Sequence, residues 1–254
     1  MIVFPAIDLV AGRVVRLERG DRARMKVYAE DPVAVAEEFR ARGAGWVHVV
    51  DLSATLEEDA AARQANAEAI AAICALEDIQ ADVGGGVRSM AAFERLLELG
   101  AARVAVGTAL VRDPALAAQI ARDYARCAVA DVAARDGQVR VNGWREGEAL
   151  SADELVARLA DLGFRHLVYT DVARDGMQTG VDTAAYEHIA RVAGFPVIAS
   201  GGVASAADIA AIAALGSQVI EGVICGRAIF EGSLAVEDAL AAARKERTCS
   251  PNAS

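Results

Sequence analysis

Two stretches of the chain share one pattern, in which an apolar run ends in consecutive glycines and a serine that can begin a helix follows at once. They are 79–89, with Gly84-Gly85-Gly86 before Ser89, and 196–205, with Gly201-Gly202 before Ser205. Glycines let a ligand approach the backbone, and the free N–H groups and dipole of a helix N-terminus attract anions. One such turn alone is more often a structural strand-to-helix connection. Two of them predict a pair of phosphate-binding turns.

Other segments repeat in the same order in the two halves of the chain. An apolar strand ending in aspartate occurs at 46–51 and again at 166–171, each soon after a glycine. A strand followed by a glycine and a short turn occurs at 106–110 and again at 225–229. Self-similarity at a nearly fixed separation is the signature of a repeated unit. The chain is therefore predicted to consist of two related halves.

Apolar strands alternate with helical segments eight times, without a break in composition. A chain of 254 residues, 54% of them hydrophobic, can bury a large core, and roughly 200 to 250 residues are routine for one α/β barrel. The alternation favours a single (β/α)8 barrel of two half-barrel repeats over a doubly wound sheet. We predict the barrel over 1–246 and a polar tail over 247–254. Strands are expected at 2–8, 46–51, 79–83, 103–106, 127–131, 166–170, 196–199 and 222–225.

Three connections are less regular. The segment 9–31 is long and rich in arginine, and connections of this length are usually lids or disordered. The segment 52–63 is expected to be a polar loop, with the next helix over 66–75. Asp136-Gly137 is a hairpin signal, so 135–144 is expected to form a small β excursion above the strand ends. Ser151 and Glu154 have the spacing of a capping box for the helix that follows.

Charge and composition exclude several classes of partner. The formal charge of −10 argues against binding to nucleic acid or to an anionic membrane surface. No segment approaches the roughly 18 apolar residues of a membrane span, and the N-terminus lacks the basic start of a secretory signal. We expect a cytoplasmic protein. The four cysteines lack metal-ligand spacing and are interpreted as reduced packing residues.

Four predicted strands end in a carboxylate, although a buried parallel strand is normally apolar throughout. The residues are Asp8, Asp51, Asp131 and Asp171, at the ends of strands one, two, five and six. Any one of them could simply cap the loop that follows. Strands one and five face each other across a barrel, however, and active sites lie at the C-terminal strand ends. Asp8 and Asp131 are therefore predicted to form an acid and base pair. His48, on strand two, is expected to belong to the core.

Twelve short motifs follow one another along the chain in a recognisable order. They are Pro5-Ala-Ile-Asp-Leu9, Gly12-Arg-Val-Val-Arg-Leu17, Gly20-Asp21, Asp31-Pro32, His48-Val-Val-Asp51, Gly85-Gly-Val-Arg88, Gly107-Thr108, Gly143-Trp144, Tyr169-Thr-Asp171, Arg174-Asp-Gly176, Ala199-Ser-Gly-Gly202 and Gly226-Arg-Ala228. Together they resemble the HisA family, the phosphoribosylformimino-aminoimidazole-carboxamide ribotide (ProFAR) isomerases of histidine biosynthesis. The resemblance runs from residue 2 to about 240. It departs from the family pattern at 54–58, at Ala130 and at 177–182.

The resemblance implies an Amadori rearrangement, the conversion of an aminoaldose with two phosphates into an aminoketose, without a metal or an organic cofactor. By analogy Asp131 is the general acid that helps to open the ribose ring, and Asp8 is the base that removes the C2 proton. Thr170 is similar to the hydroxyl that assists at the same centre. Asp171 is also assigned to the substrate site. Two carboxylates can divide these roles only where their surroundings separate their pKa values.

The resemblance also assigns the residues that hold the substrate. Trp144 is similar to the aromatic residue that covers the substrate's imidazole, although a lone tryptophan in a loop is more often plain packing. Arg16, in the first loop, could grip a phosphate or remain solvated. The first cradle comprises Gly85, Gly86, Arg88, Gly107 and Thr108, and the second cradle comprises Gly180, Ser200, Gly201, Gly202, Gly226 and Arg227.

Three other functions were weighed. One is a dual-substrate isomerase that also acts on phosphoribosylanthranilate in tryptophan synthesis. Another is the related cyclase subunit HisF, which is disfavoured because the first strand continues here into Arg13-Val-Val-Arg-Leu17. The third is a non-catalytic sugar-phosphate binder, against which the presence of both Asp8 and Asp131 argues. We predict a monomer with a small, doubly phosphorylated substrate.

Overall fold

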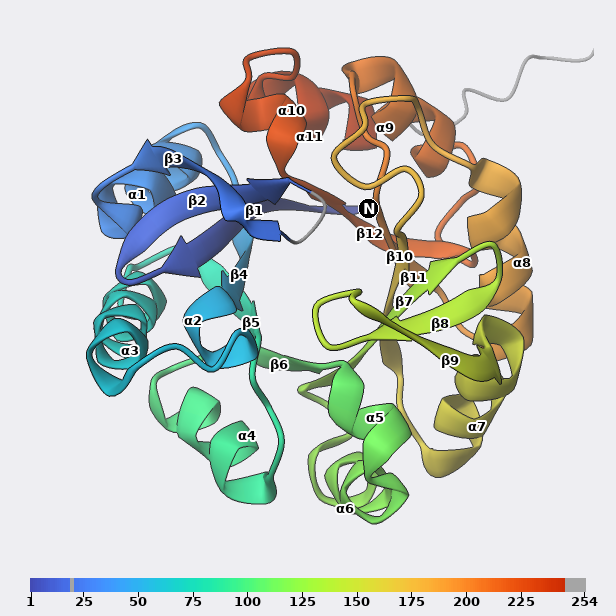
Figure 1. Cartoon of the computed structure of the whole chain (residues 1–254). Coiled ribbons are helices and arrows are strands. Elements are labelled where there is room, and N and C mark those ends of the chain that lie inside the picture. Colours follow the sequence, from blue (N-terminus) through green and yellow to red (C-terminus); the bar gives the residue numbers. More distant parts are fainter. Residues whose placement is uncertain (19–20, 245–254) are drawn as a thin grey trace, which may run out of the picture.

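The structure of the chain, a computed structural model, describes residues 1–18 and 21–244. At its centre eight parallel strands form a closed ring surrounded by helices (Figure 1). This arrangement confirms the predicted (β/α)8 barrel. The predicted tail, 247–254, lies outside the described residues. In ring order the strands are β1 (Ile2–Val10), β4 (Trp46–Asp51), β5 (Gln80–Gly84), β6 (Arg103–Val106), β7 (Ala128–Arg135), β10 (His166–Asp171), β11 (Val197–Ser200) and β12 (Ile220–Cys225).

The helices begin where the sequence supplies a cap. Asp31 and Asp113 accept hydrogen bonds from the first turns of their helices, and a proline follows each of them. Ser151 and Glu154 form the predicted capping box. The longer helices are α1 (Pro32–Ala41), α3 (Ala60–Cys74), α4 (Met90–Glu98), α6 (Pro114–Tyr124), α7 (Ala152–Leu162), α8 (Thr183–Ala193), α9 (Ala206–Ala213) and α11 (Val236–Arg244), and the short ones are α2 (Leu52–Thr55), α5 (Thr108–Arg112) and α10 (Arg227–Phe230).

Successive strand residues point alternately outward and inward, which gives the barrel two apolar layers. The outward residues pack against the helices in one large cluster that includes Ile7, Val49 and Leu167. The inward residues form a smaller cluster that includes Phe4 and Val168. This inner layer fills the barrel below the C-terminal strand ends, so the interior is a packed core and the strand ends are left to carry the site.

The predicted repeat is visible in the backbone. Gly107 and Gly226, each before a short helix, have φ of −111° and −109° and ψ of −91° and −93°. Gly85 and Gly201 both have positive φ, at +108° and +97°. A Cβ on Gly85 would lie 2.3 Å from the carbonyl oxygen of Asp51, and a Cβ on Gly201 would lie 2.6 Å from that of Asp171. Each glycine turn therefore packs directly against the end of the neighbouring strand, Gly85 against β4 and Gly201 against β10, and no side chain fits there.

The irregular connections are more ordered than the sequence indicated. Residues 9–31 are not an unstructured lid: β2 (Arg13–Glu18) and β3 (Asp21–Ala29) pair as a hairpin that extends β1. The expected polar loop 52–63 contains α2 and the start of α3, whose N-cap is Asp59. The β excursion after β7 has β8 (Gln138–Val141) as predicted and a further strand, β9 (Glu146–Ser151).

Two composition-based expectations bear on the described residues. None of the helices in 1–18 and 21–244 is long and apolar enough to span a membrane. Cys74, Cys127 and Cys225 are free thiols, and burial raises the pKa of each above its ordinary value. Cys249 lies outside the part of the chain that the structure describes.

Candidate active site

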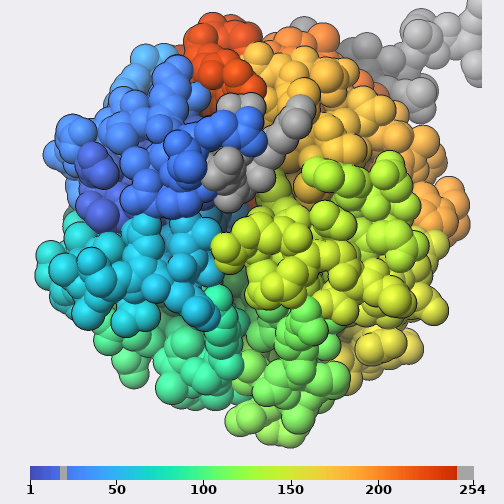
Figure 2. Space-filling view, viewed as in Figure 1, coloured from blue at the N-terminus to red at the C-terminus, as the bar shows by residue number. Residues whose placement is uncertain are grey.

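A cavity of about 230 Å³ lies at the C-terminal ends of the barrel strands. Its walls come from both halves of the chain. Figure 2, seen from this end, shows the β2–β3 hairpin in blue and the β8–β9 excursion in yellow-green, both lying over the ring. Side chains from these two excursions, Arg16 and Arg140 among them, take part in the wall. The cavity is therefore assembled from strand ends below and excursions above, as enzyme sites in this fold are.

Most of the residues predicted from the sequence line this one cavity. They are Asp8, Asp131 and Thr170 from the predicted catalytic group, and Arg16, Gly85, Gly86, Arg88, Gly107, Thr108, Trp144, Ser200, Gly201, Gly202, Gly226 and Arg227 from the predicted binding group.

Asp171 and Gly180 lie behind the wall instead. The Asp171 carboxylate accepts a hydrogen bond from the N–H of Ala173 at 3.0 Å and pairs with Arg174 at 3.2 Å. The N–H of Gly180 donates to the carbonyl oxygen of Gly202 at 3.1 Å. Both residues thus support the second cradle from outside, and direct contact with a substrate stays a prediction for them.

Asp8 is tied to the first excursion through Arg16. The guanidinium Nη1 of Arg16 lies 3.5 Å from Oδ2 of Asp8, and its Nη2 pairs with Asp175 in the connection after β10. Burial raises the pKa of Asp8 above its ordinary value, and the Arg16 guanidinium opposes that shift. Arg16 thereby joins β1, the β2–β3 hairpin and the β10–α8 connection around one carboxylate.

Asp131 has different surroundings. It lies on β7 beside Gly107, where an added Cβ would be 3.5 Å from Oδ2 of Asp131. Burial raises the pKa of Asp131 to about 6, while His48 opposes the shift. A carboxyl group with this pKa holds its proton far more readily near neutral pH than an ordinary aspartate does. Asp131 is thus suited to donate a proton.

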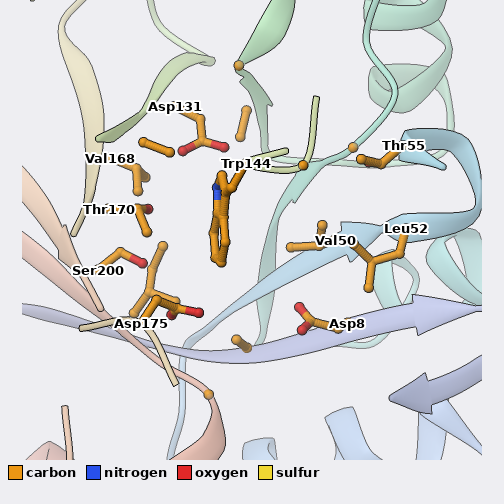
Figure 3. A pocket seen from close by; sticks show the side chains of 18 of the residues that line it. Asp8, Val50, Leu52, Thr55, Asp131, Trp144, Val168, Thr170, Asp175 and Ser200 are labelled. Carbon is orange, nitrogen blue, oxygen red and sulfur yellow. The ribbon is translucent and has the colours of Figure 1, made fainter. Parts of the chain in front are cut away.

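Trp144 lies in the middle of the cavity. Figure 3 shows its indole between Asp131 and Thr170 on one side and Val50 and Asp8 on the other. The backbone at Trp144 has a φ of +67°, an unusual conformation for a bulky residue. The β8–β9 excursion therefore presents an aromatic face between the two carboxylates. A flat ring of a substrate could stack on this face.

Each cradle has one arginine whose guanidinium is held in place by backbone carbonyl oxygens. Arg88 donates to the backbone oxygens of Ala54 and Thr55 at 3.2 and 3.1 Å, which fixes it at the edge of the first cradle. Arg227 donates to the backbone oxygen of Gly176, which fixes it at the second. The helices α5 and α10 begin at glycines with no side-chain cap, so their first N–H groups are left for a ligand.

Sequence reasoning missed several polar residues of the cavity wall, which are His48, Thr55, Arg140, Asn142 and Asp175. Asp175 stands in the motif 174–176 that the sequence analysis noted, but its partnership with Arg16 depends on a contact between segments far apart in the chain. His48 is buried, as expected, but its side chain also reaches the cavity, where it is 8% exposed. Its inward position follows from the alternation of β4, in which Trp46, His48 and Val50 share the inner face. Within the described ranges, no three His, Cys, Asp or Glu side chains are grouped as a metal site requires.

The family model for the histidine biosynthesis proteins matches residues 2–235. Three similar proteins, each a 1-(5-phosphoribosyl)-5-((5-phosphoribosylamino)methylideneamino)imidazole-4-carboxamide isomerase, come from Rhizorhabdus wittichii, Sphingopyxis alaskensis and Zymomonas mobilis. Their identities are 46% over 244 residues, 44% over 242 and 43% over 245. The alignments cover 96%, 95% and 96% of this chain and 99%, 98% and 96% of the relatives. The chain belongs to the histidine biosynthesis protein family.

Proposed function

We propose that the chain isomerises ProFAR to the corresponding phosphoribulosyl aminoketose, PRFAR, in histidine biosynthesis. The observation that carries this proposal is that Asp8 and Asp131 line one cavity between two glycine turns related by the repeat. The family match and the relatives' shared name support the same reaction. A substrate with a phosphate at each end suits a cavity with an anion-binding turn in each half.

Asp131 acts as the general acid in the first step. Its carboxyl group donates a proton to the ring oxygen of the ribose as the bond between C1 and that oxygen breaks. The amine nitrogen supplies the electron pair, so C1 and nitrogen form a protonated Schiff base. The raised pKa of Asp131, about 6, supports this role because a useful fraction of the group still carries its proton near neutral pH.

Asp8 acts as the base in the second step. Its carboxylate removes the C2 proton, and the electrons of that bond form a double bond between C1 and C2 while the Schiff base becomes an amine. The enol then gains a proton at C1 and loses one from its hydroxyl, which gives the aminoketose with an unchanged formula. Arg16 beside Asp8 favours the ionised carboxylate that this step needs. Thr170, buried on the same wall as Asp131, assists at this centre.

The remaining residues bind and orient the substrate. The first and second cradles hold the two phosphates, and Trp144 covers the imidazole. Binding of the two phosphates fixes the ribose between the two carboxylates. Such orientation can lower the activation free energy of an enzyme reaction substantially. We further propose that the chain acts as a cytoplasmic monomer, without nucleic acid as a partner. The charge of −10 supports the last point.

Turnover of ProFAR by the purified chain tests the proposal. We expect formation of the aminoketose without any added metal or cofactor, and loss of that activity in a double variant D8N/D131N. A preparation that binds inorganic phosphate at both cradles but leaves ProFAR unchanged would show a sugar-phosphate binder instead.

A further inference from the structure

His48 and Asp82 are two buried titratable residues that the mechanism above does not use. They are register partners on the neighbouring strands β4 and β5. Asp82 is fully buried, and His48 is 8% exposed where it reaches the cavity. Nδ1 of His48 lies 3.5 Å from Oδ2 of Asp82. The two side chains thus connect the packed interior of the barrel with the wall of the site.

Among the described residues, neither the Asp82 carboxylate nor Nδ1 of His48 has a hydrogen-bond partner, so the contact between them at 3.5 Å is an ion pair without a hydrogen bond. Arg103 is its register partner on the other side, but the Arg103 guanidinium pairs with Glu221 at 2.7 Å and covers the ring of Trp46 at 4.8 Å. An ionised carboxylate buried without a partner is strongly unfavourable. The group that offsets this charge is His48, provided that its imidazole is a cation.

The surroundings of His48 favour that cation. Burial alone would lower the pKa of His48. Asp82, Asp131 and Asp8 together outweigh the effect of burial, with Asp82 contributing most, and the pKa of His48 rises above its ordinary value. In return, the positive charge of His48 favours the ionised form of Asp131.

We propose that Asp82 keeps His48 doubly protonated, and that the resulting cation stabilises the Asp131 carboxylate formed when Asp131 gives its proton to the ring oxygen. This inference rests on the proposed role of Asp131 as the general acid. His48 and Asp82 are positioning residues in this account, because they act on the reaction through Asp131. Without the His48 cation, burial would leave Asp131 holding its proton too tightly to donate it efficiently.

Several charged groups face the pair and set the sign of the expected pH effects. From above, Asp131 and Asp8 add negative charge, and Arg16 compensates part of it at Asp8. From the other end of the barrel, Glu221 is already paired with Arg103 and His166. A change of charge at His48 therefore acts on both carboxyl groups, and at Asp8 the Arg16 guanidinium has the larger effect.

The protonation of His48 can be observed directly by nitrogen NMR of histidine-labelled protein, since the chain has only three histidines. Comparison with H48Q assigns the signal. We expect both ring nitrogens of His48 to be protonated at pH 7 in the unmodified protein and the ring to become neutral in D82N. A neutral His48 at pH 7 in the unmodified protein would overturn the proposal, whether or not any variant folds.

Kinetics of D82N then test the link to Asp131. D82N removes two opposing charges, because the His48 cation lowers the pKa of Asp131 and the Asp82 carboxylate raises it, with His48 the larger of the two. The falling limb of kcat/KM against pH should therefore move to higher pH, by about half a unit. We expect kcat to fall by roughly 3- to 30-fold with KM changed by less than about 2-fold, because neither residue is assigned to substrate binding. H48Q should move the same limb in the same direction.

The matched control is H166Q, which makes the same substitution in a histidine–carboxylate pair at the opposite end of the barrel. It should leave the pH profile unchanged. A D82N enzyme with the unmodified profile and kcat, or an equal shift in H166Q, would reject the role of the pair while ProFAR turnover by the unmodified protein still stood. Absence of ProFAR turnover in the unmodified protein would instead reject the proposed function itself.

Discussion

Asp8 and Asp131 carry the same functional group in different electrostatic surroundings. Arg16 lies beside Asp8, whereas Asp131 has only the more distant His48 to oppose its burial. Burial raises the pKa of both carboxyl groups, and the Arg16 guanidinium opposes that rise at Asp8 but not at Asp131. Such a difference in surroundings is what the proposed division into base and acid requires.

Conversion of either aspartate to asparagine should abolish most turnover and preserve binding. The amide keeps nearly the same shape but neither accepts the C2 proton nor donates to the ring oxygen. We expect kcat to fall by about 10² to 10⁴ in D8N and in D131N, with the Kd for ProFAR changed by less than about 10-fold. The measurements are steady-state rates and calorimetric titration. Retention of more than about a tenth of kcat in either variant would contradict the assignment.

The pKa of Asp131 predicts a specific pH profile. Because the acid works only while protonated, kcat/KM should fall as pH rises through about 6, the pKa of Asp131 in the free protein. Bound phosphates bring negative charge, which favours the protonated carboxyl group, so the falling limb of kcat should lie at higher pH than that of kcat/KM. Initial rates from pH 5 to 9 give both limbs. A falling limb of kcat at lower pH than that of kcat/KM would contradict this electrostatic argument.

At the scale of single elements, the glycine turns fix where a phosphate can bind. Gly201 and Gly194 both have positive φ, but an added Cβ would meet the Asp171 carbonyl oxygen at 2.6 Å in one case and nothing within 4 Å in the other. G201A should therefore destabilise the protein by about 1 kcal/mol more than G194A does and should raise KM for ProFAR. Urea unfolding and steady-state rates measure both effects. Equal KM values in the two variants would exclude Gly201 from phosphate binding.

The elements with a clear local signal were predictable. The barrel strands are continuous apolar runs, and the helices after Asp31, Asp113 and Ser151 begin at recognisable caps, so their bounds agree with the structure to within a few residues. β9 was missed because its sequence, EGEALS, is polar and lies at an exposed edge. The alanine-rich start of α3 was missed because small residues make no apolar stripe, although its cap at Asp59 was present.

The site was predictable only where a residue's place follows from the strand that carries it. Residues at strand ends follow from the fold, which is how Asp8 and Asp131 could be placed across one cavity. The place of Asp175 depends on its contact with Arg16, which is far away in the chain and which no local pattern encodes, whereas the inward position of His48 follows from the alternation of β4. Asp171 was predicted in the site but does not line the cavity. It ends a strand, as expected, but its side chain pairs with Arg174.

At the scale of the whole molecule, charged residues also close the end of the barrel opposite the site. Glu221 on β12 pairs with Arg103 on β6 at 2.7 Å and with His166 on β10 at 2.9 Å. Burial alone would raise the pKa of Glu221, but His166 and Arg103 outweigh it and lower the pKa below its ordinary value. These contacts link three strands around the ring, so they should contribute to global stability.

E221Q should reduce the free energy of unfolding by about 2 kcal/mol at pH 7, the size typical of hydrogen bonds to a charged group. A carboxyl group whose pKa is lowered by folding stabilises the protein at pH values above its ordinary pKa. This stabilisation is lost as the pH falls through the pKa of the folded state. The difference in unfolding free energy between E221Q and the unmodified protein should therefore shrink below about pH 4.5. Urea unfolding at several pH values measures it. The control E38Q breaks an exposed pair with Arg42 and should cost much less stability than E221Q does. A difference that does not depend on pH would contradict the ion-pair explanation.

We propose that the two halves of the barrel each bind one phosphate of a single substrate. The most direct test compares kcat/KM for ProFAR and for phosphoribosylanthranilate on the same preparation. Phosphoribosylanthranilate has one phosphate, so it leaves one cradle empty, and its carboxylate needs a cation that a protein of charge −10 must supply locally. We predict that kcat/KM is several orders of magnitude higher for ProFAR, because an empty cradle contributes no binding energy to the reaction of phosphoribosylanthranilate. Comparable values for the two substrates would contradict the account and identify a dual-substrate isomerase.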